Sequence, residues 1–84
     1  MDQLRFPLYR RSANGLNWYR INSPSELVEV QRVGRKHVIH RLSALAYPEH
    51  VRIQELIAMS DGHVEECPAE VVEKLLGQQH EEGR

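Results

Sequence analysis

The sequence predicts an α+β fold: a four-stranded antiparallel meander of two hairpins, a central helix, a segment that is either a short fifth strand or a connection, and a C-terminal helix. Three observations lead to this prediction. Apolar and other side chains alternate along the first half of the chain, as in strands with one buried face. Two turn dipeptides, Asn14-Gly15 and Gly34-Arg35, divide that half into hairpins. Residues 47–59 carry apolar side chains at helical spacing.

The first hairpin is centred on Asn14-Gly15, because both residues tolerate the positive φ angles of a tight turn. Residues 4–9 alternate in polarity before this turn, and residues 16–21 return antiparallel after it. Pro7 has no N–H group to donate to a neighbouring strand. We therefore expect the first strand at an edge of the sheet, unless the Pro7 nitrogen points outward.

The second hairpin is preceded by a helix-like signal. Residues 23–26 have the serine-to-glutamate spacing of a capping box with proline at the first helical position, which predicts one helical turn. Residues 27–33 can be read as a continuation of that helix. Their three β-branched valines favour a strand instead, and Gly34-Arg35 is typical of a hairpin turn with glycine first. Residues 36–42 form the return strand.

The central helix is predicted over residues 47–59, because Pro48 suits the first turn and Asp61-Gly62 suits the end. One face should lie on the sheet, and it carries Ile53, Leu56, Ile57 and Ser60. Val51 and Ala58 lie nearly opposite. We therefore expect a second cover over this back face, and the C-terminal helix is the obvious candidate.

The last part of the chain is predicted to form a short segment and a helix. Residues 63–66 are either a fifth strand or a connection. The helix restarts at 67–70, again with proline in its first turn, and an inward stripe follows at Val71, Val72, Leu75 and Leu76. We expect Gly77 to end it. Residues 1–77 are then a single compact domain, and residues 78–84 are a flexible polar tail.

Composition is that of a small soluble globular protein. The chain has 84 residues, 40% of them hydrophobic, and mixed charge, which predicts one folded domain. No apolar run approaches ~18 residues, so we expect no membrane span. The N-terminus lacks the pattern of a signal peptide, and the single cysteine cannot form an internal disulfide. Together these features favour the cytoplasm.

The net charge of −1 hides an asymmetry between the two halves. Residues 1–47 hold eight Lys/Arg and three acidic residues, a net charge of +5, whereas residues 48–84 hold three and nine, a net charge of −6. One interpretation is that the halves attract each other on folding. The other is a basic sheet surface and an acidic helical surface exposed on one molecule.

Motifs of enzymes and metal sites are absent from the sequence. His37 and His40 are three residues apart, which places them on opposite faces of a strand. His63 and Cys67 are only two ligands, too few for a site. Cys67 has Glu65, Glu66 and Glu70 as neighbours, which oppose a thiolate, so we expect a partly buried thiol at a helix entry. No nucleophile elbow or phosphate-binding loop is found, and we expect neither catalysis nor a cofactor.

The function class that fits best is a non-enzymatic protein-interaction or accessory module, through a protein partner or self-association. An edge strand can accept a partner's strand, and the charge split could drive head-to-tail association. The alternative is a nucleic-acid binder that stacks bases on a basic, aromatic-containing sheet face. The aromatic residues of that face are Tyr9 and Trp18, and we expect Trp18 to be more exposed than Tyr19, which lies on the opposite face of the same strand. The candidate partner surface is Arg10, Arg11, Trp18, Arg20, Arg32, Arg35, Lys36 and Arg41.

Overall fold

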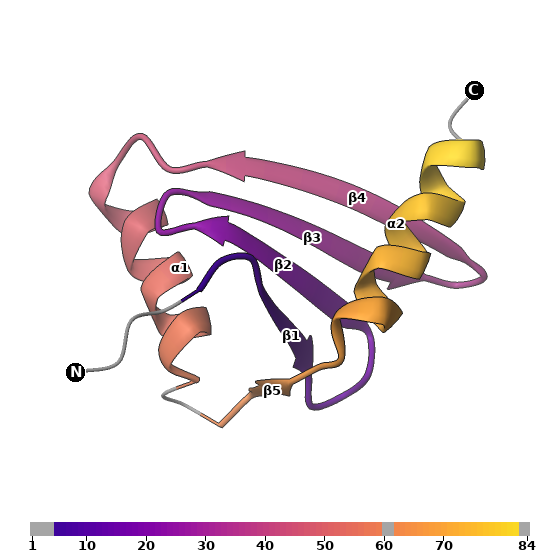
Figure 1. Ribbon diagram of the computed structural model, residues 1–84, viewed down its shortest axis with the longest axis horizontal. Coiled ribbons are helices and arrows are strands. Elements are labelled where there is room, and N and C mark those ends of the chain that lie inside the picture. Colours follow the sequence, from indigo (N-terminus) through magenta and orange to yellow (C-terminus); the bar gives the residue numbers. More distant parts are fainter. Residues whose placement is uncertain (1–4, 60–61, 83–84) are drawn as a thin grey trace.

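The computed structural model describes residues 5–59 and 62–82, with side chains as far as residue 77. This part of the chain forms a five-stranded antiparallel sheet and two helices (Figure 1). The elements in chain order are β1 (Leu8–Ser12), β2 (Asn17–Ser23), β3 (Glu26–Val33), β4 (Lys36–Ser43), α1 (Tyr47–Ala58), β5 (Val64–Glu66) and α2 (Ala69–Glu82). The strand order across the sheet is β4-β3-β2-β1-β5. The predicted α+β fold, with its meander, central helix, short fifth strand and C-terminal helix, is confirmed.

The two helices cover opposite faces of the sheet. On one face Tyr19, Ile21 and Leu27 form the core with Ile53 and Leu56 of α1. Successive residues of a strand point to opposite sides, so their neighbours belong to the other face. There the buried side chains are Val28 and Val30 of β3 and Val72 of α2, and α2 runs across several strands (Figure 1).

The expectation that the C-terminal helix covers the back of the central helix is therefore wrong. The strands offer α2 an apolar strip of their own at Val28 and Val30, which needs a cover on the far side of the sheet. On the back of α1, Val51 is half-buried and Ala58 is exposed.

The first strand lies inside the sheet, so its predicted edge position is wrong. β5 pairs with β1 on the side away from β2, with Arg10 opposite Glu66 and Ser12 opposite Val64. Pro7 precedes β1 and needs no ladder partner, and the Phe6–Pro7 peptide bond is cis. The edges are β4 and the short β5.

Each hairpin turn contains a glycine with positive φ. Gly34 has φ = 64°, and the pair Val33–Lys36 closes a two-residue hairpin, as predicted. The first hairpin has a longer connection, residues 13–16, in which Gly15 has φ = 76° and Asn14 stays out of the left-handed region. Its Asn14 Oδ1 instead accepts the Leu16 N–H at 3.0 Å.

The helical turn expected over residues 23–26 does not form. β2 extends to Ser23 and β3 begins at Glu26, with two residues between them. The Ser23 hydroxyl accepts the Ser25 N–H at 3.1 Å, so it closes a local turn rather than caps a helix. The strand interpretation of residues 27–33 is confirmed.

Both ends of α1 are capped. The Glu49 carboxylate accepts the N–H groups of Leu45 and Ala46 at 2.9 and 3.1 Å, which lowers the pKa of this side chain. At the other end Met59 takes the left-handed conformation, with φ = 53°. Asp61, half of the predicted Asp61-Gly62 stop, lies outside the described residues, and so does Ser60 of the predicted sheet-facing side of the helix. Gly62, the other half of the stop, has φ = 76° after the helix has ended.

α2 does not end at Gly77, where its end was predicted, but continues to Glu82. A glycine within a helix costs only about 1 kcal/mol relative to alanine, which neighbours of higher propensity can offset. Neither of the described helices combines the length and the apolar character needed to cross a bilayer.

Replacing Gly77 by alanine should stabilise the fold. Gly77 is helical, and a Cβ atom there would meet nothing within 4 Å, so the variant gains helix propensity without a clash. We expect an increase of about 0.5–1 kcal/mol in the free energy of unfolding by urea denaturation. Gly34→Ala is the matched control and should destabilise, because its φ of 64° is left-handed. Equal effects of both variants would contradict this account.

Candidate functional site

Arg10 does not lie on a surface. It is 7% exposed, and its side chain points toward α1. Its Nε donates to the Leu56 carbonyl and its Nη2 to the Ile57 carbonyl, each at 3.0 Å, while Nη1 donates to the Tyr9 carbonyl at 2.9 Å. The last carbonyls of a helix lack partners within it and carry negative partial charge, so a guanidinium is well matched to them. Arg10 therefore joins β1 to the end of α1.

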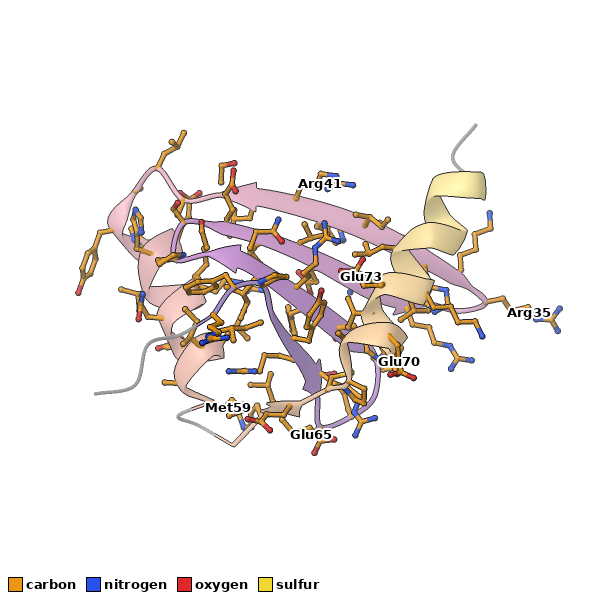
Figure 2. The ribbon with its side chains drawn as sticks, in the orientation of Figure 1. Arg35, Arg41, Met59, Glu65, Glu70 and Glu73 are labelled. Atoms are coloured by element: carbon orange, nitrogen blue, oxygen red, sulfur yellow. The ribbon has the colours of Figure 1, made fainter. Side chains whose placement is uncertain are left out.

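Five other candidate residues share the face that α2 covers. The pairings Arg11–Trp18, Arg20–Val28, Val28–Arg41 and Arg32–His37 place them there. They are Arg11, Trp18, Arg20, Arg32 and Arg41. The remaining two, Arg35 and Lys36, lie at the β3–β4 turn, with Arg35 at the tip of the hairpin (Figure 2).

Acidic residues from the second half of the chain neutralise part of this face. Arg11 forms an ion pair with Glu65 of β5, and Arg20 forms one with Glu73 of α2 at 3.0 Å. Figure 2 shows Glu73 over the strands and Glu65 near the far edge of the sheet. These two pairs support the interpretation that the oppositely charged halves attract each other on folding.

Glu73 also binds Tyr9, whose hydroxyl donates to its carboxylate at 2.5 Å. This hydrogen bond, with a smaller contribution from Arg20, lowers the pKa of Glu73. Burial, followed by the hydrogen bond to Glu73, raises the pKa of Tyr9 to about 12. Tyr9, Arg20 and Glu73 thus fasten α2 to β1 and β2.

Trp18 is half-buried and more exposed than Tyr19, which is 7% exposed, as predicted. Its ring meets the His37 ring edge-on, with centroids 5.8 Å apart. Tyr9 is engaged with Glu73 of α2. Neither aromatic ring is therefore presented on an open, flat platform.

Cys67 is a buried free thiol just before α2, and burial raises its pKa. A raised pKa disfavours the nucleophilic thiolate. His37 and His40 lie on opposite faces of β4, as their spacing predicts. Within residues 5–59 and 62–82, no three or more His, Cys, Asp or Glu side chains gather as metal ligands.

β4 is the longer of the two edge strands, with eight residues against the three of β5. Arg32 N–H donates to the carbonyl of Leu16, the residue just before β2, and so points away from β4; the Arg32–His37 pair is therefore not hydrogen-bonded across β3 and β4. The N–H and C=O groups of His37, Ile39, Arg41 and Ser43 consequently point away from β3. Ala44 N–H donates inward to the Ser25 carbonyl at 2.8 Å, which agrees with this alternation.

A groove lies beside the half of β4 that runs toward α1. It has a volume of about 500 Å³ and an apolar floor of Leu27, Leu42 and Pro48. Its charged and polar walls are Glu29, His40, Arg41, Glu49 and Arg52. α2 crosses the sheet nearer the β3–β4 turn, and Figure 2 shows Arg41 on the outer side of β4.

This site was not predicted, because the expected edge was the strand of residues 4–9, which contains Pro7. The available signal was the composition of residues 36–43. They combine two histidines, Lys36 and Arg41 with no acidic residue, and neither face of the strand is fully buried. Charged side chains of this kind are typical of edge strands.

Comparison with models of known protein families, with curated proteins and with solved structures gives no significant match.

Loss of the Arg10 guanidinium should destabilise the fold strongly. In Arg10→Met the helix-end carbonyls lose their donors in a buried site, and we expect a loss of about 2–4 kcal/mol in the free energy of unfolding. Arg10→Lys keeps the charge but not the forked geometry, so we expect an intermediate loss. Arg41→Met, at an exposed position, should stay within about 0.5 kcal/mol of the wild type. A small effect of Arg10→Met would show that α1 is held by packing alone.

The Tyr9–Glu73 hydrogen bond should make stability depend on pH at both extremes. Because the pKa of Glu73 is lowered on folding, its contribution is present above the usual carboxyl pKa and is lost as pH falls through the lowered value. Because the pKa of Tyr9 is raised to about 12, its contribution is present below the usual tyrosine pKa and is lost as pH rises toward 12.

Tyr9→Phe should therefore weaken both limbs of the stability–pH curve, by about 0.5–1 kcal/mol for this part-exposed pair. Urea denaturation across the pH range is the measurement. Tyr47→Phe removes a hydroxyl from a residue that is 79% exposed and should leave the curve unchanged. Parallel curves for wild type and Tyr9→Phe would exclude this hydrogen bond as their source.

Proposed function

We propose that this protein is a non-enzymatic protein-interaction module that receives an extended segment of a partner protein along β4. The observation that carries the proposal is the row of outward backbone groups at His37, Ile39, Arg41 and Ser43 beside a groove of about 500 Å³. Backbone groups of an edge strand give affinity for any extended peptide. Pockets beside the strand give selectivity through alternate side chains.

The groove suits the second of these roles. A strand added to β4 would direct every second side chain toward the α1 side of the sheet. Leu27, Leu42 and Pro48 form an apolar floor there, and α1 forms the wall. Nearby Leu45 is 91% exposed and Tyr47 is 79% exposed, so a partner could bury further apolar surface next to the groove.

The alternative, nucleic-acid binding by the basic sheet face, has weaker support. α2 covers that face, and Glu65 and Glu73 neutralise Arg11 and Arg20. Stacking needs exposed rings, whereas Tyr9 binds Glu73 and Trp18 meets His37. Among the described residues, the basic side chains without an acidic partner are chiefly those along β4 and its turn, which favours a ligand at that edge.

Selection of a random peptide library displayed on phage against the full chain tests the proposal. We expect enriched peptides to bind in extended form and to shift the amide NMR signals of residues 39–43. The matched pair Arg41→Pro and Arg41→Ala separates backbone from side chain. Both lose the guanidinium, but only the proline variant also loses the outward N–H, so it should bind at least about tenfold more weakly than the alanine variant.

Proline should be tolerated at this position, because the Arg41 N–H does not pair with β3. Circular dichroism would check the fold, and the pair Ser43→Pro and Ser43→Ala repeats the test at the next outward N–H. Enriched peptides that shift only the back of α1, or equal binding by each proline and alanine pair, would refute the proposal. So would a steeply salt-dependent shift of β4 by mixed oligonucleotides with no binding of peptides.

A further inference from the structure

We infer that the partner segment is acidic, with a carboxylate opposite Arg41 and an apolar side chain at the adjacent position, opposite Leu42. This inference rests on the proposed function and adds the chemistry of the ligand. Three features support it: the positive charges along β4, the hydrogen bonds that already engage the nearby carboxylates, and the alternation of side chains between the two faces of an added strand.

The charges along β4 have one sign. Residues 36–43 contain Lys36, Arg41 and two histidines and no acidic side chain. Arg41 is exposed and has no acidic partner among the described residues. Arg52, across the groove, makes only a long contact of 3.4 Å to Glu29, and its side chain is 52% exposed.

The carboxylates that line the groove are already bound. Glu29 Oε2 accepts the Asn17 side-chain amide at 2.7 Å, and its Oε1 faces Arg52. Glu49 accepts the two N–H groups before α1. The cationic side chains therefore have spare capacity for a carboxylate, whereas the anionic ones have little for a cation. An acidic ligand matches this balance, and a basic one does not.

The alternation of side chains along an added strand determines which ligand residue should be acidic and which apolar. The ligand residue opposite Arg41 lies on the α2 side of the sheet, where a carboxylate can form a cross-strand pair with the guanidinium. Its neighbour, opposite Leu42, points to the other side, onto the floor made by Leu27, Leu42 and Pro48. An acidic residue beside an apolar one is the shortest pattern that satisfies both positions.

A second copy of this chain fits less well. Pairing β4 with β4 brings two strands of the same charge together. β5 is acidic, but it is three residues long and Glu65 is engaged with Arg11. The acidic residues Glu81 and Glu82 belong to α2 and offer no extended strand.

Synthetic peptides of about nine residues, in which valine alternates with glutamate, glutamine or lysine, test the inference on the full chain. The glutamate peptide should bind tightest and shift the amides of residues 39–43, and the glutamine peptide should bind about fivefold more weakly at low salt. Arg41→Glu should reverse the order, so that the lysine peptide binds best. Arg5→Glu makes the same charge change beside β1, with β2 and β3 between it and β4, and should keep the original order.

Equal binding of all three peptides at the β4 amides would overturn the inference and leave the proposed function standing. So would library peptides that bind at β4 without an excess of acidic residues. Absence of any binding at β4, in the library and in the synthetic series, refutes the proposed function itself. A concentration-dependent mass that Arg41→Pro abolishes would identify a second copy as the occupant and would equally overturn the acidic partner.

Discussion

The contact between Arg10 and the last turn of α1 is the constraint on which the rest of the arrangement depends. A charged side chain buried in a core of this size is costly unless its donors are satisfied. Here the Leu56 and Ile57 carbonyls satisfy them, and the negative end of the helix dipole adds a favourable field without any carboxylate. The contact fixes where α1 ends on the sheet. It therefore also fixes where the start of α1, with Pro48 and Arg52, stands beside β4 and forms one wall of the groove.

On the face of the sheet that α2 covers, the basic first half of the chain meets the acidic second half. Arg11 and Arg20 project from the strands, and the chain returns with Glu65 and Glu73 to meet them. Exposed ion pairs contribute little to stability, so the buried Val28, Val30 and Val72 hold α2 in place. The ion pairs instead favour one placement of the acidic helix over others. Among the described residues, most of the basic side chains without an acidic partner then lie along β4, at the β3–β4 turn and at the adjoining end of β3.

Much of the fold was predictable because local signals and tertiary packing agree. Three predictions that depend only on nearby residues are confirmed. They are the hairpin turn at Gly34-Arg35, the alternating strands, and the sheet-facing side of α1 at Ile53, Leu56 and Ile57. The failures concern long-range choices. Pro7 suggested an edge, but nothing local reveals that three residues of β5 return to β1. Val51 and Ala58 suggested a second cover for α1, but the valines of β3 compete for α2.

The site was harder to predict for the same reason. Arg10 and Arg11 are adjacent in the sequence and equally basic, yet one lies in the core and the other on the surface. What decides between them is which of the two alternating faces of β1 is turned toward α1. The list of basic residues was therefore a correct description of composition but not of a surface. The candidate residues comprise a helix-end donor (Arg10), two ion-pair partners of β5 and α2 (Arg11 and Arg20), Trp18, and the cations of β3, of β4 and of the turn between them.

The positive charge of the β4 edge has two physical consequences that follow from one cause. An exposed strand with unpaired backbone groups is a template for any extended chain, including another copy of the same protein. A row that holds Lys36 and Arg41 and no acidic residue disfavours pairing between identical β4 strands, because the new ladder would bring like charges close together. The same row makes pairing with an acidic strand favourable. Under the proposed function, the side chains that disfavour pairing of β4 with itself are thus the same ones that select an acidic partner strand.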